Sequence, residues 1–153
     1  MTKLQLGSLR DLRDKIGQEV VVSDWLEISQ ERIDRFAEAT DDHQWIHVDV
    51  HRAQRESPFQ ATVAHGFLTL SMLSRLLNSS IEFKTAKMGL NYGFNRLRFT
   101  APVPAGSRVR GRFTLKALEE IKGGVQTTWS VELECEGSDK PCLVAEWVTR
   151  RYE

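Results

Sequence analysis

The C-terminal half of the chain alternates apolar and polar residues in a way that predicts an antiparallel sheet. The alternation runs through residues 109–117 and resumes through residues 125–135. A period of two with one polar side is typical of strands that bury one face and leave the other in water. The pair Gly123-Gly124 separates the two runs and predicts a hairpin. Residues 87–100 and 142–152 are predicted to form two further strands.

The segment 66–77 has a different pattern, which predicts a helix. Its apolar residues fall on nearly every side of a helix: Phe67, Leu68, Leu70, Met72, Leu73, Leu76 and Leu77. A helix that is apolar all round is a buried one, and this one is too short to span a membrane. We therefore expect an α+β fold, in which a strongly curved antiparallel sheet wraps around one buried helix.

The N-terminal half predicts shorter elements. Residues 19–28 are expected to form a strand. Ser29 is suited to N-cap a helix that continues to about Thr40. A polar break over residues 41–49 follows, and Asp49 can cap a second short helix. The break therefore predicts a loop between two helices.

Length and charge narrow the class of protein. The chain has 153 residues and is predicted to be one domain over residues 1–153. Its 21 basic and 21 acidic residues balance, which argues against a nucleic-acid or anionic-membrane partner. The N-terminus lacks the apolar run of a secretory signal, and no stretch approaches the roughly 18 apolar residues of a membrane span. We expect a cytoplasmic protein with Cys135 and Cys142 reduced.

The candidate chemistry lies in the polar break and at the start of the predicted central helix. All four histidines fall between positions 43 and 65. Asp42 and His47 lie five positions apart on a non-helical segment, so a loop can direct both at one water molecule and activate it. Gly66 would begin the buried helix, where its free N–H and the helix dipole suit a developing oxyanion. The alternative is an Asx-turn beside a solvated histidine.

Other interpretations of the neighbouring residues stay open. The spacing of His43, His47 and His51 would align three metal ligands on one helix, but the break and the lack of a completing ligand favour no metal site. His65 is interpreted as a structural residue at the helix start, with a hydrogen-bonding role in the site as the alternative. The basic residues of the first alternating strand are interpreted as a solvated sheet face, with coenzyme A phosphates as the alternative partner: Arg108, Arg110, Arg112 and Lys116.

Two segments carry a resemblance to a known family. They are Asp42-His-Gln-Trp-Ile-His-Val-Asp49 and Ala64-His-Gly-Phe-Leu-Thr-Leu-Ser71. Together they resemble the MaoC-like dehydratase family, which includes the (R)-specific enoyl-CoA hydratases, and within it the nodulation-protein-N-like branch. The family signature has Gly, Asn and Pro where this chain has Asp41, Gln44 and Trp45, while the spacing from Asp42 to His47 is kept.

The resemblance implies a hot-dog fold, a sheet wrapped around a long central helix, and a homodimer with an acyl tunnel near the subunit interface. It also implies site residues. Asp42 and His47 would hold and activate the water, the N–H of Gly66 would bind the thioester oxygen, and Ser71 would orient groups in the site. No metal or redox cofactor is implied, since coenzyme A enters only as part of the substrate.

The resulting hypothesis is a hydro-lyase of fatty acyl metabolism that reversibly hydrates a trans-2-enoyl-CoA to an (R)-3-hydroxyacyl-CoA. One alternative is a hot-dog acyl-CoA thioesterase, in which the same groups direct water at the carbonyl carbon. Another is a non-catalytic protein that binds acyl thioesters. Release of free thiol separates the first alternative from the hypothesis, and binding without turnover identifies the second.

Overall fold

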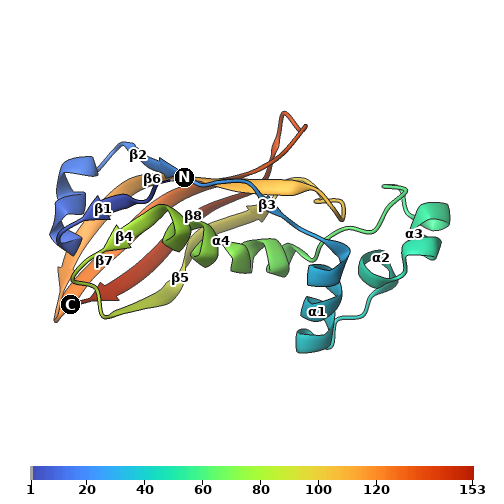
Figure 1. Cartoon of the computed structure of the whole chain (residues 1–153), viewed down its shortest axis with the longest axis horizontal. Coiled ribbons are helices and arrows are strands. Elements are labelled where there is room, and N and C mark those ends of the chain that lie inside the picture. Colours follow the sequence, from blue (N-terminus) through green and yellow to red (C-terminus); the bar gives the residue numbers. More distant parts are fainter. Residues whose placement is uncertain (1) are drawn as a thin grey trace.

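A curved antiparallel sheet forms the body of the molecule (Figure 1). The computed structural model describes residues 2–153. The sheet follows the order β2 (Glu19–Val22), β6 (Arg108–Ile121), β7 (Gly124–Cys135), β8 (Pro141–Tyr152) and β5 (Met88–Phe99), and the short β3 (Leu26–Glu27) also pairs with β6. β6 and β7 confirm the alternation pattern, and β5 and β8 confirm the two further strands. The prediction of one continuous strand over residues 19–28 is wrong, because the segment forms two separate strands, β2 and β3.

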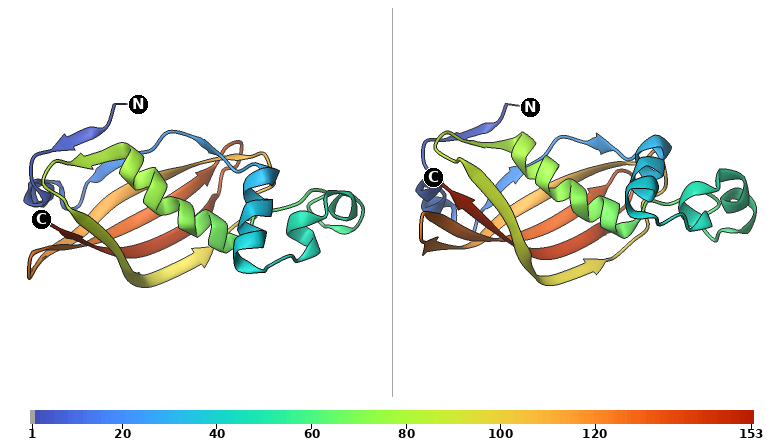
Figure 2. Two further views of the ribbon diagram at one scale, coloured as in Figure 1. Left: turned by 60° about the horizontal axis from the view of Figure 1, so that its bottom comes forward. Right: turned by 90° about the horizontal axis from the view of Figure 1, so that it is seen from below.

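The remaining elements lie around this sheet. They are β1 (Leu4–Leu6), the 3₁₀ helix η1 (Leu9–Lys15), α1 (Gln30–Thr40), α2 (Trp45–Val48), α3 (Val50–Glu56), α4 (Gly66–Ser80) and β4 (Ile81–Phe83). β1 and β4 pair in parallel as a separate two-stranded sheet. α1, α2 and α3 lie beyond one end of the main sheet, and η1 lies at the opposite end (Figures 1 and 2).

The helix α4 crosses one face of the sheet, as Figure 2 shows. Its residues Leu73, Leu76 and Leu77 are buried in one cluster with Phe113 and Trp129 of the sheet. This arrangement confirms the predicted hot-dog architecture. Within residues 2–153, no helix combines the length and the apolar character needed to cross a membrane.

The expectation that α4 is buried on every side is wrong. The side chain of Phe67 is 66% exposed, and Ser71 is exposed as well. The sheet covers the helix from one side only, so none of residues 2–153 covers the opposite side. The apolar residues there are available for contact with another molecule.

The Gly-Gly turn between β6 and β7 has a steric reason. Gly123 has a φ of +84°, a conformation that suits glycine. A Cβ on Gly124 would lie 1.9 Å from the carbonyl oxygen of Arg151 on β8. Only glycine lets the two backbones approach this closely, so the turn fixes how β7 meets β8.

Two predicted helix caps position the segment that leads to α4. The hydroxyl of Ser29 accepts a hydrogen bond from the N–H of Arg32 at 3.2 Å and begins α1. The carboxylate of Asp49 accepts one from the N–H of Arg52 at 3.0 Å and begins α3. The break between them contains α2, a single turn that is too short to produce a periodic pattern.

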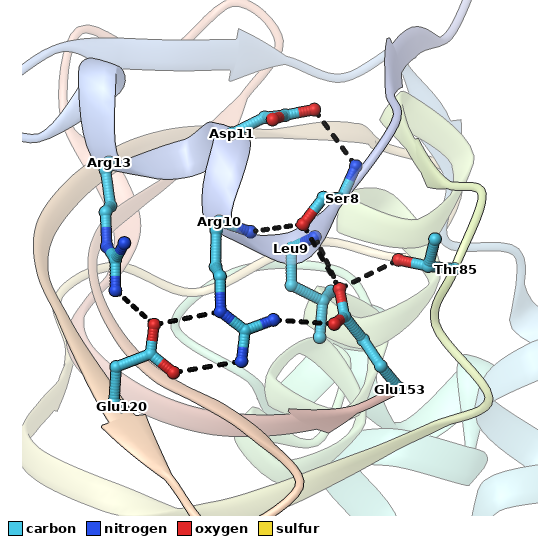
Figure 3. A network of polar contacts seen from close by, with 8 residues as sticks. All are labelled: Ser8, Leu9, Arg10, Asp11, Arg13, Thr85, Glu120 and Glu153. Carbon is cyan, nitrogen blue, oxygen red and sulfur yellow. Dashed lines mark hydrogen bonds and ion pairs between the residues drawn. The ribbon is translucent and has the colours of Figure 1, made fainter.

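A polar network joins η1 to Glu153, the residue after β8, at the η1 end of the molecule (Figure 3). The carboxylate of Glu153 accepts hydrogen bonds from the N–H of Leu9 at 3.0 Å, from Thr85 Oγ1 at 2.8 Å and from Arg10 Nη1 at 2.6 Å. Arg10 also makes two 3.0 Å contacts with Glu120. We call this group the Glu153 network. Its hydrogen bonds and ion pairs hold η1 against the sheet.

The outer face of β6 carries the basic residues that the alternation places there. Arg108 pairs with Glu136, and Arg110 pairs with Glu134. Arg112 lies 2.8 Å from Glu19. The interpretation of these residues as a charged, solvated sheet face is therefore confirmed. Both cysteines are free and buried, as expected, and burial raises the pKa of the Cys142 thiol to about 12.

Candidate functional site

The end of α1 places Asp42. Asp41 terminates the helix in the left-handed conformation, with a φ of 58°. Glycine favours that conformation, and aspartate is one of the few other residues that tolerate it. The side chain of Asp42 is 52% exposed, and its Oδ1 accepts a hydrogen bond from the N–H of Gln44 at 3.4 Å. The Asx-type contact, which was the alternative to a catalytic role for Asp42, is therefore present. It leaves Oδ2 available for another partner.

His47 lies on α2 and is almost fully enclosed, with 8% exposure. Its Nδ1 lies 2.6 Å from the carbonyl oxygen of Val63. Because a carbonyl oxygen can only accept, Nδ1 carries the hydrogen, and Nε2 keeps a free lone pair when the ring is neutral. Burial lowers the pKa of His47, against the opposing effect of the Val63 hydrogen bond. A neutral imidazole with a free Nε2 is the form that accepts a proton.

Two further contacts hold α2 in place. The N–H of Val63 donates to the carbonyl of Ile46 at 3.0 Å, so α2 is tied to the segment before α4. Gln30 Nε2 on α1 donates to the carbonyl of His47 at 2.8 Å. Thr62 Oγ1 in turn donates to Gln30 Oε1 at 2.5 Å. α1 and the segment before α4 therefore fix the position of the His47 imidazole.

His65, at the start of α4, links Asp42 to His47. Its Nε2 donates to the backbone carbonyl of Asp42 at 2.9 Å. Its ring stacks on that of His47, with centroids 3.8 Å apart and an interplanar angle of 23°. Phe36 of α1 covers the His65 ring at a centroid distance of 4.9 Å. These contacts match the alternative of a hydrogen-bonding role for His65 better than a purely structural role. In the sequence, the only signal for that role was the His65-Gly66 motif.

Asp42, His47 and His65 form the one group within residues 2–153 that could hold a metal ion. Their possible ligand atoms all lie within 4.8 Å of one another. His47 Nδ1 and His65 Nε2 already bond to backbone carbonyls, which leaves only His47 Nε2, His65 Nδ1 and the carboxylate as donors. The histidine spacing weighed from the sequence is not realised, since His43 lies 3.7 Å from Glu38 and His51 is exposed on α3.

Gly66 directly follows His65 and begins α4, which has no side-chain cap. The first N–H groups of such a helix lack intrahelical partners and, with the helix dipole, attract negative charge. A Cβ on Gly66 would lie 3.0 Å from the ring of Phe99, so only glycine leaves this approach unstrained. A cavity of about 330 Å³ lies here, and its lining includes Phe59, Gly66, Thr69 and Phe99. Asp42 and His47 are not part of that lining.

Ser71 lies more than one turn further along α4. Its hydroxyl donates to the carbonyl of Phe67 at 2.7 Å, within the same helix. The structure therefore brings Asp42, His47 and Gly66 to one end of α4, while Ser71 lies on the exposed side of the helix beyond them. The start of α4 therefore offers a carboxylate and a neutral imidazole that suit proton transfer to and from water, beside helix N–H groups that suit an oxyanion.

Comparison with known proteins places this chain in a family. The family model of the MaoC-like domain matches residues 11–136. The chain is similar to the 3-hydroxyacyl-thioester dehydratase Z of Mycobacterium tuberculosis, with 49% identity over 144 residues, which cover 94% of this chain and 95% of the relative. It is equally similar to nodulation protein N of Rhizobium leguminosarum bv. viciae, with 49% identity over 145 residues, or 93% and 89% of the two chains.

A solved structure supports the fold independently. The (R)-hydratase from A. caviae involved in PHA biosynthesis superposes with a TM-score of 0.71 at 24% identity, over 88% of this chain and 94% of that one. At this identity the likeness concerns the fold. The family model and the two close relatives settle the family: the chain belongs to the MaoC-like dehydratases, with nodulation protein N among its close relatives.

Proposed function

We propose that the protein reversibly hydrates a trans-2-enoyl-CoA to an (R)-3-hydroxyacyl-CoA, as a hydro-lyase. The observation that carries the proposal is the pairing of Asp42 with a buried, neutral His47 at the start of α4. The names of the relatives support the same class of reaction, since one is a 3-hydroxyacyl-thioester dehydratase.

In the proposed mechanism, one water molecule lies between the Asp42 carboxylate and His47 Nε2. Asp42 is the preferred base and His47 shares the water and the proton. The water oxygen bonds to C3 of the enoyl thioester, and the electron pair of the C2–C3 double bond moves through C2 toward the thioester oxygen. The Gly66 N–H and the dipole of α4 stabilise the enolate-like state. The proton taken from water then returns to C2, which completes the addition.

Binding of the substrate follows the same geometry. The thioester carbonyl lies against the start of α4, and the acyl chain extends along the exposed side of the helix, where Ser71 orients groups through its hydroxyl. No metal or redox cofactor takes part, and coenzyme A enters as part of the substrate. We therefore expect turnover to be unchanged by a metal chelator such as EDTA, and loss of activity that added Zn²⁺ restores would contradict this part of the proposal.

We also propose that the protein acts as a homodimer in the cytoplasm. β5 is the edge strand of the sheet, so its outer backbone groups can pair with another chain. Large apolar side chains on β5 and α4 are exposed close to that edge: Phe67, Met88, Leu90, Tyr92 and Phe99. A second copy of the chain would cover both the edge of β5 and these apolar side chains. A monomeric mass in light scattering at assay concentration would contradict the dimer, and the cytoplasmic location stays a prediction from the sequence.

The test of the function uses purified protein with crotonyl-CoA. The absorbance of the conjugated enoyl thioester is followed while a thiol reagent reports free coenzyme A. We expect loss of the enoyl band without thiol release, and a chiral assay of the product should give the (R) isomer. Thiol release in step with the reaction would establish a thioesterase. Binding of longer enoyl-CoAs without any change in the band would establish a binding protein.

A further inference from the structure

A second cavity, of about 210 Å³, lies between the C-terminal half of α4 and the strands β5 and β8. Its lining is Ser74, Asn78, Gly89, Leu90, Asn91, Trp147, Thr149, Arg150 and Arg151. The lining contains two arginines and no acidic residue. This is unusual for the molecule: the cavity beside Arg112 on the outer face of the sheet is also lined by Glu19, Glu132 and Glu134. We call the second site the Arg151 cavity.

Two residues that line the Arg151 cavity each have a buried donor without a partner among residues 2–153. Trp147 is 2% exposed, and its Nε1 has no hydrogen-bond acceptor. The Nε of Arg151 is buried and unpartnered too. Buried polar groups without partners are costly, so such groups point to a ligand that satisfies them. By contrast, the indole of Trp129 in the same core donates to Thr127 Oγ1 at 3.0 Å.

The guanidinium of Arg151 has neutral neighbours. Its Nη2 donates to Asn78 Oδ1 at 2.8 Å, and its Cζ lies 4.8 Å from the centre of the Phe83 ring. Among residues 2–153, no carboxylate lies within 4.0 Å of it, whereas Arg108, Arg110 and Arg112 each pair with one. Burial lowers the pKa of Arg151, although a guanidinium stays charged at neutral pH. A partly buried cation without a counter-ion favours an anionic ligand.

The cavity also lies in line with the candidate site. Phe67, Ser71, Ser74 and Asn78 are spaced four, three and four residues apart, so they share one side of α4. Ser74 is about 12 Å from Gly66 along the helix axis and Asn78 about 18 Å, at about 1.5 Å per residue. An extended alkyl chain advances about 1.25 Å per carbon–carbon bond. A chain whose thioester binds at Gly66 therefore reaches the cavity with about 10 to 15 carbons.

We infer that the Arg151 cavity binds a carboxylate at the far end of the acyl chain, so that the preferred substrates are ω-carboxyacyl thioesters. This inference rests on the proposed function. The planar fork of Arg151 matches a carboxylate. Trp147 Nε1 and the amide N–H groups of Asn78 supply further donors, while the amide of Asn91 bonds with Ser74 at 3.3 Å. The phosphates of coenzyme A are less suited, because they belong to the other end of the substrate and carry a bulky nucleoside that this small cavity does not admit.

The experiment compares two saturated ligands that differ only at the far end, dodecanedioyl-CoA and dodecanoyl-CoA. Calorimetry measures the binding of each to the wild-type protein and to the Arg151→Gln, Asn78→Ala and Arg96→Gln variants. Arg96 is an exposed arginine on β5 outside the cavity lining and provides the matched control. We expect wild type to bind the diacid ester about tenfold more tightly, the size of one charge-assisted hydrogen bond. Arg151→Gln should abolish that ratio, Asn78→Ala should reduce it, and Arg96→Gln should leave it unchanged.

Three results would overturn the inference. If wild type bound the two esters equally, the cavity would not bind the terminal carboxylate. If Arg151→Gln weakened the binding of both esters equally, the arginine would contact coenzyme A or be needed for folding. Arg151-dependent binding of glutarate alone, without any preference between the esters, would make the cavity an independent anion site. Thermal unfolding reports whether Arg151→Gln folds, and Asn78→Ala, at an exposed helix position, carries the test if it does not.

Turnover separates this inference from the proposed function. The same comparison with trans-2-dodecenedioyl-CoA and trans-2-dodecenoyl-CoA should give a higher kcat/KM for the diacid, and the ratio should fall in Arg151→Gln. If the diacid ester binds more tightly but neither enoyl ester is hydrated, the cavity assignment stands and the hydratase proposal fails. If both are hydrated at the same rate and bind equally, the hydratase stands and the cavity assignment fails.

Discussion

The two ends of the molecule use polar groups in opposite ways. At the η1 end, the Glu153 carboxylate is bonded to a backbone N–H, a hydroxyl and a guanidinium, and Arg10 divides its donors between two carboxylates (Figure 3). At the α1–α3 end, Asp42 Oδ2 has only a 4.0 Å approach to His65, and one nitrogen of the His47 ring is left free. The first cluster is saturated with partners and the second is held in place by its backbone contacts.

The difference shows how each cluster contributes. In the Glu153 network, every bond that forms is between groups of the chain itself, so its effect is on the stability of the η1 end. In the site, the bonds of His47 and His65 go to carbonyls that fix tautomer and orientation, and the atoms that we propose to react stay unpaired. Reactive groups must keep a vacant position for water and substrate. The comparison therefore predicts that substitutions at the two ends affect different measurements.

The largest expected effect concerns Asp42 and His47. Asp42→Asn and His47→Gln should each lower kcat/KM for crotonyl-CoA by about 100- to 10,000-fold, the usual contribution of a positioned acid or base. The melting temperature should stay close to wild type, because Asp42 is half exposed and glutamine can still donate toward Val63. Adjacent residues provide matched controls: Asp41→Asn keeps a side chain that tolerates the left-handed cap, and His43→Gln alters an exposed histidine. Near-wild-type turnover in a folded Asp42→Asn or His47→Gln protein would exclude the mechanism.

A smaller effect is expected from His65, which we propose as a positioning residue. His65→Gln keeps an amide N–H near the Asp42 carbonyl but removes the ring that stacks on His47. It also removes the electrostatic effect of His65, which helps to lower the pKa of His47. We expect kcat to fall about tenfold because the pair is less well oriented. The pKa of His47 should rise. Since protonated His47 cannot act as a base, the acid limb of the pH–rate profile should move to higher pH. A rate loss with an unchanged pH profile would limit His65 to a structural role.

The fold was largely predictable from local patterns. The alternation along β6 and β7 and the Gly123-Gly124 pair report burial and turn geometry, which depend on adjacent residues. The break between β2 and β3, by contrast, depends on how each meets the distant β6. The pairing of β1 with β4 joins residues 77 positions apart, as in Leu4 with Ile81, and three-residue strands leave no periodic signal. The exposed side of α4 was missed because, in the sequence, apolar residues on an exposed side of a helix look the same as core residues.

The candidate site was predictable to a lesser extent. The spacing of Asp42 and His47 on a break and the His65-Gly66 motif identified the residues that the structure brings together at the start of α4. The stacking of His65 on His47 and the tie from Gln30 to the His47 carbonyl were not predictable, because each joins different elements in space. The Arg151 cavity has the same origin, since α4, β5 and β8 supply its lining. The roles of Asp42, His47, Gly66 and Ser71 stay predictions.

The smallest expected effect lies at the η1 end and concerns stability. Hydrogen bonds from the N–H of Leu9, from Thr85 and from Arg10 lower the pKa of Glu153 to about 2. Because the ordinary value is 4.5, this carboxylate contributes stability that is fully present above about pH 4.5 and is lost as the pH falls toward 2. Glu153→Gln should lower the melting temperature by a few degrees at neutral pH, and the difference from wild type should disappear as the pH approaches 2.

Glu132→Gln, which removes an exposed carboxylate on β7 that makes no ion pair among residues 2–153, should show no such pH-dependent difference. Turnover at neutral pH should be unchanged in both variants. If Glu153→Gln lowered kcat as His65→Gln is expected to, the two ends would be coupled through the sheet, and the division between a saturated cluster and a reactive one would be wrong.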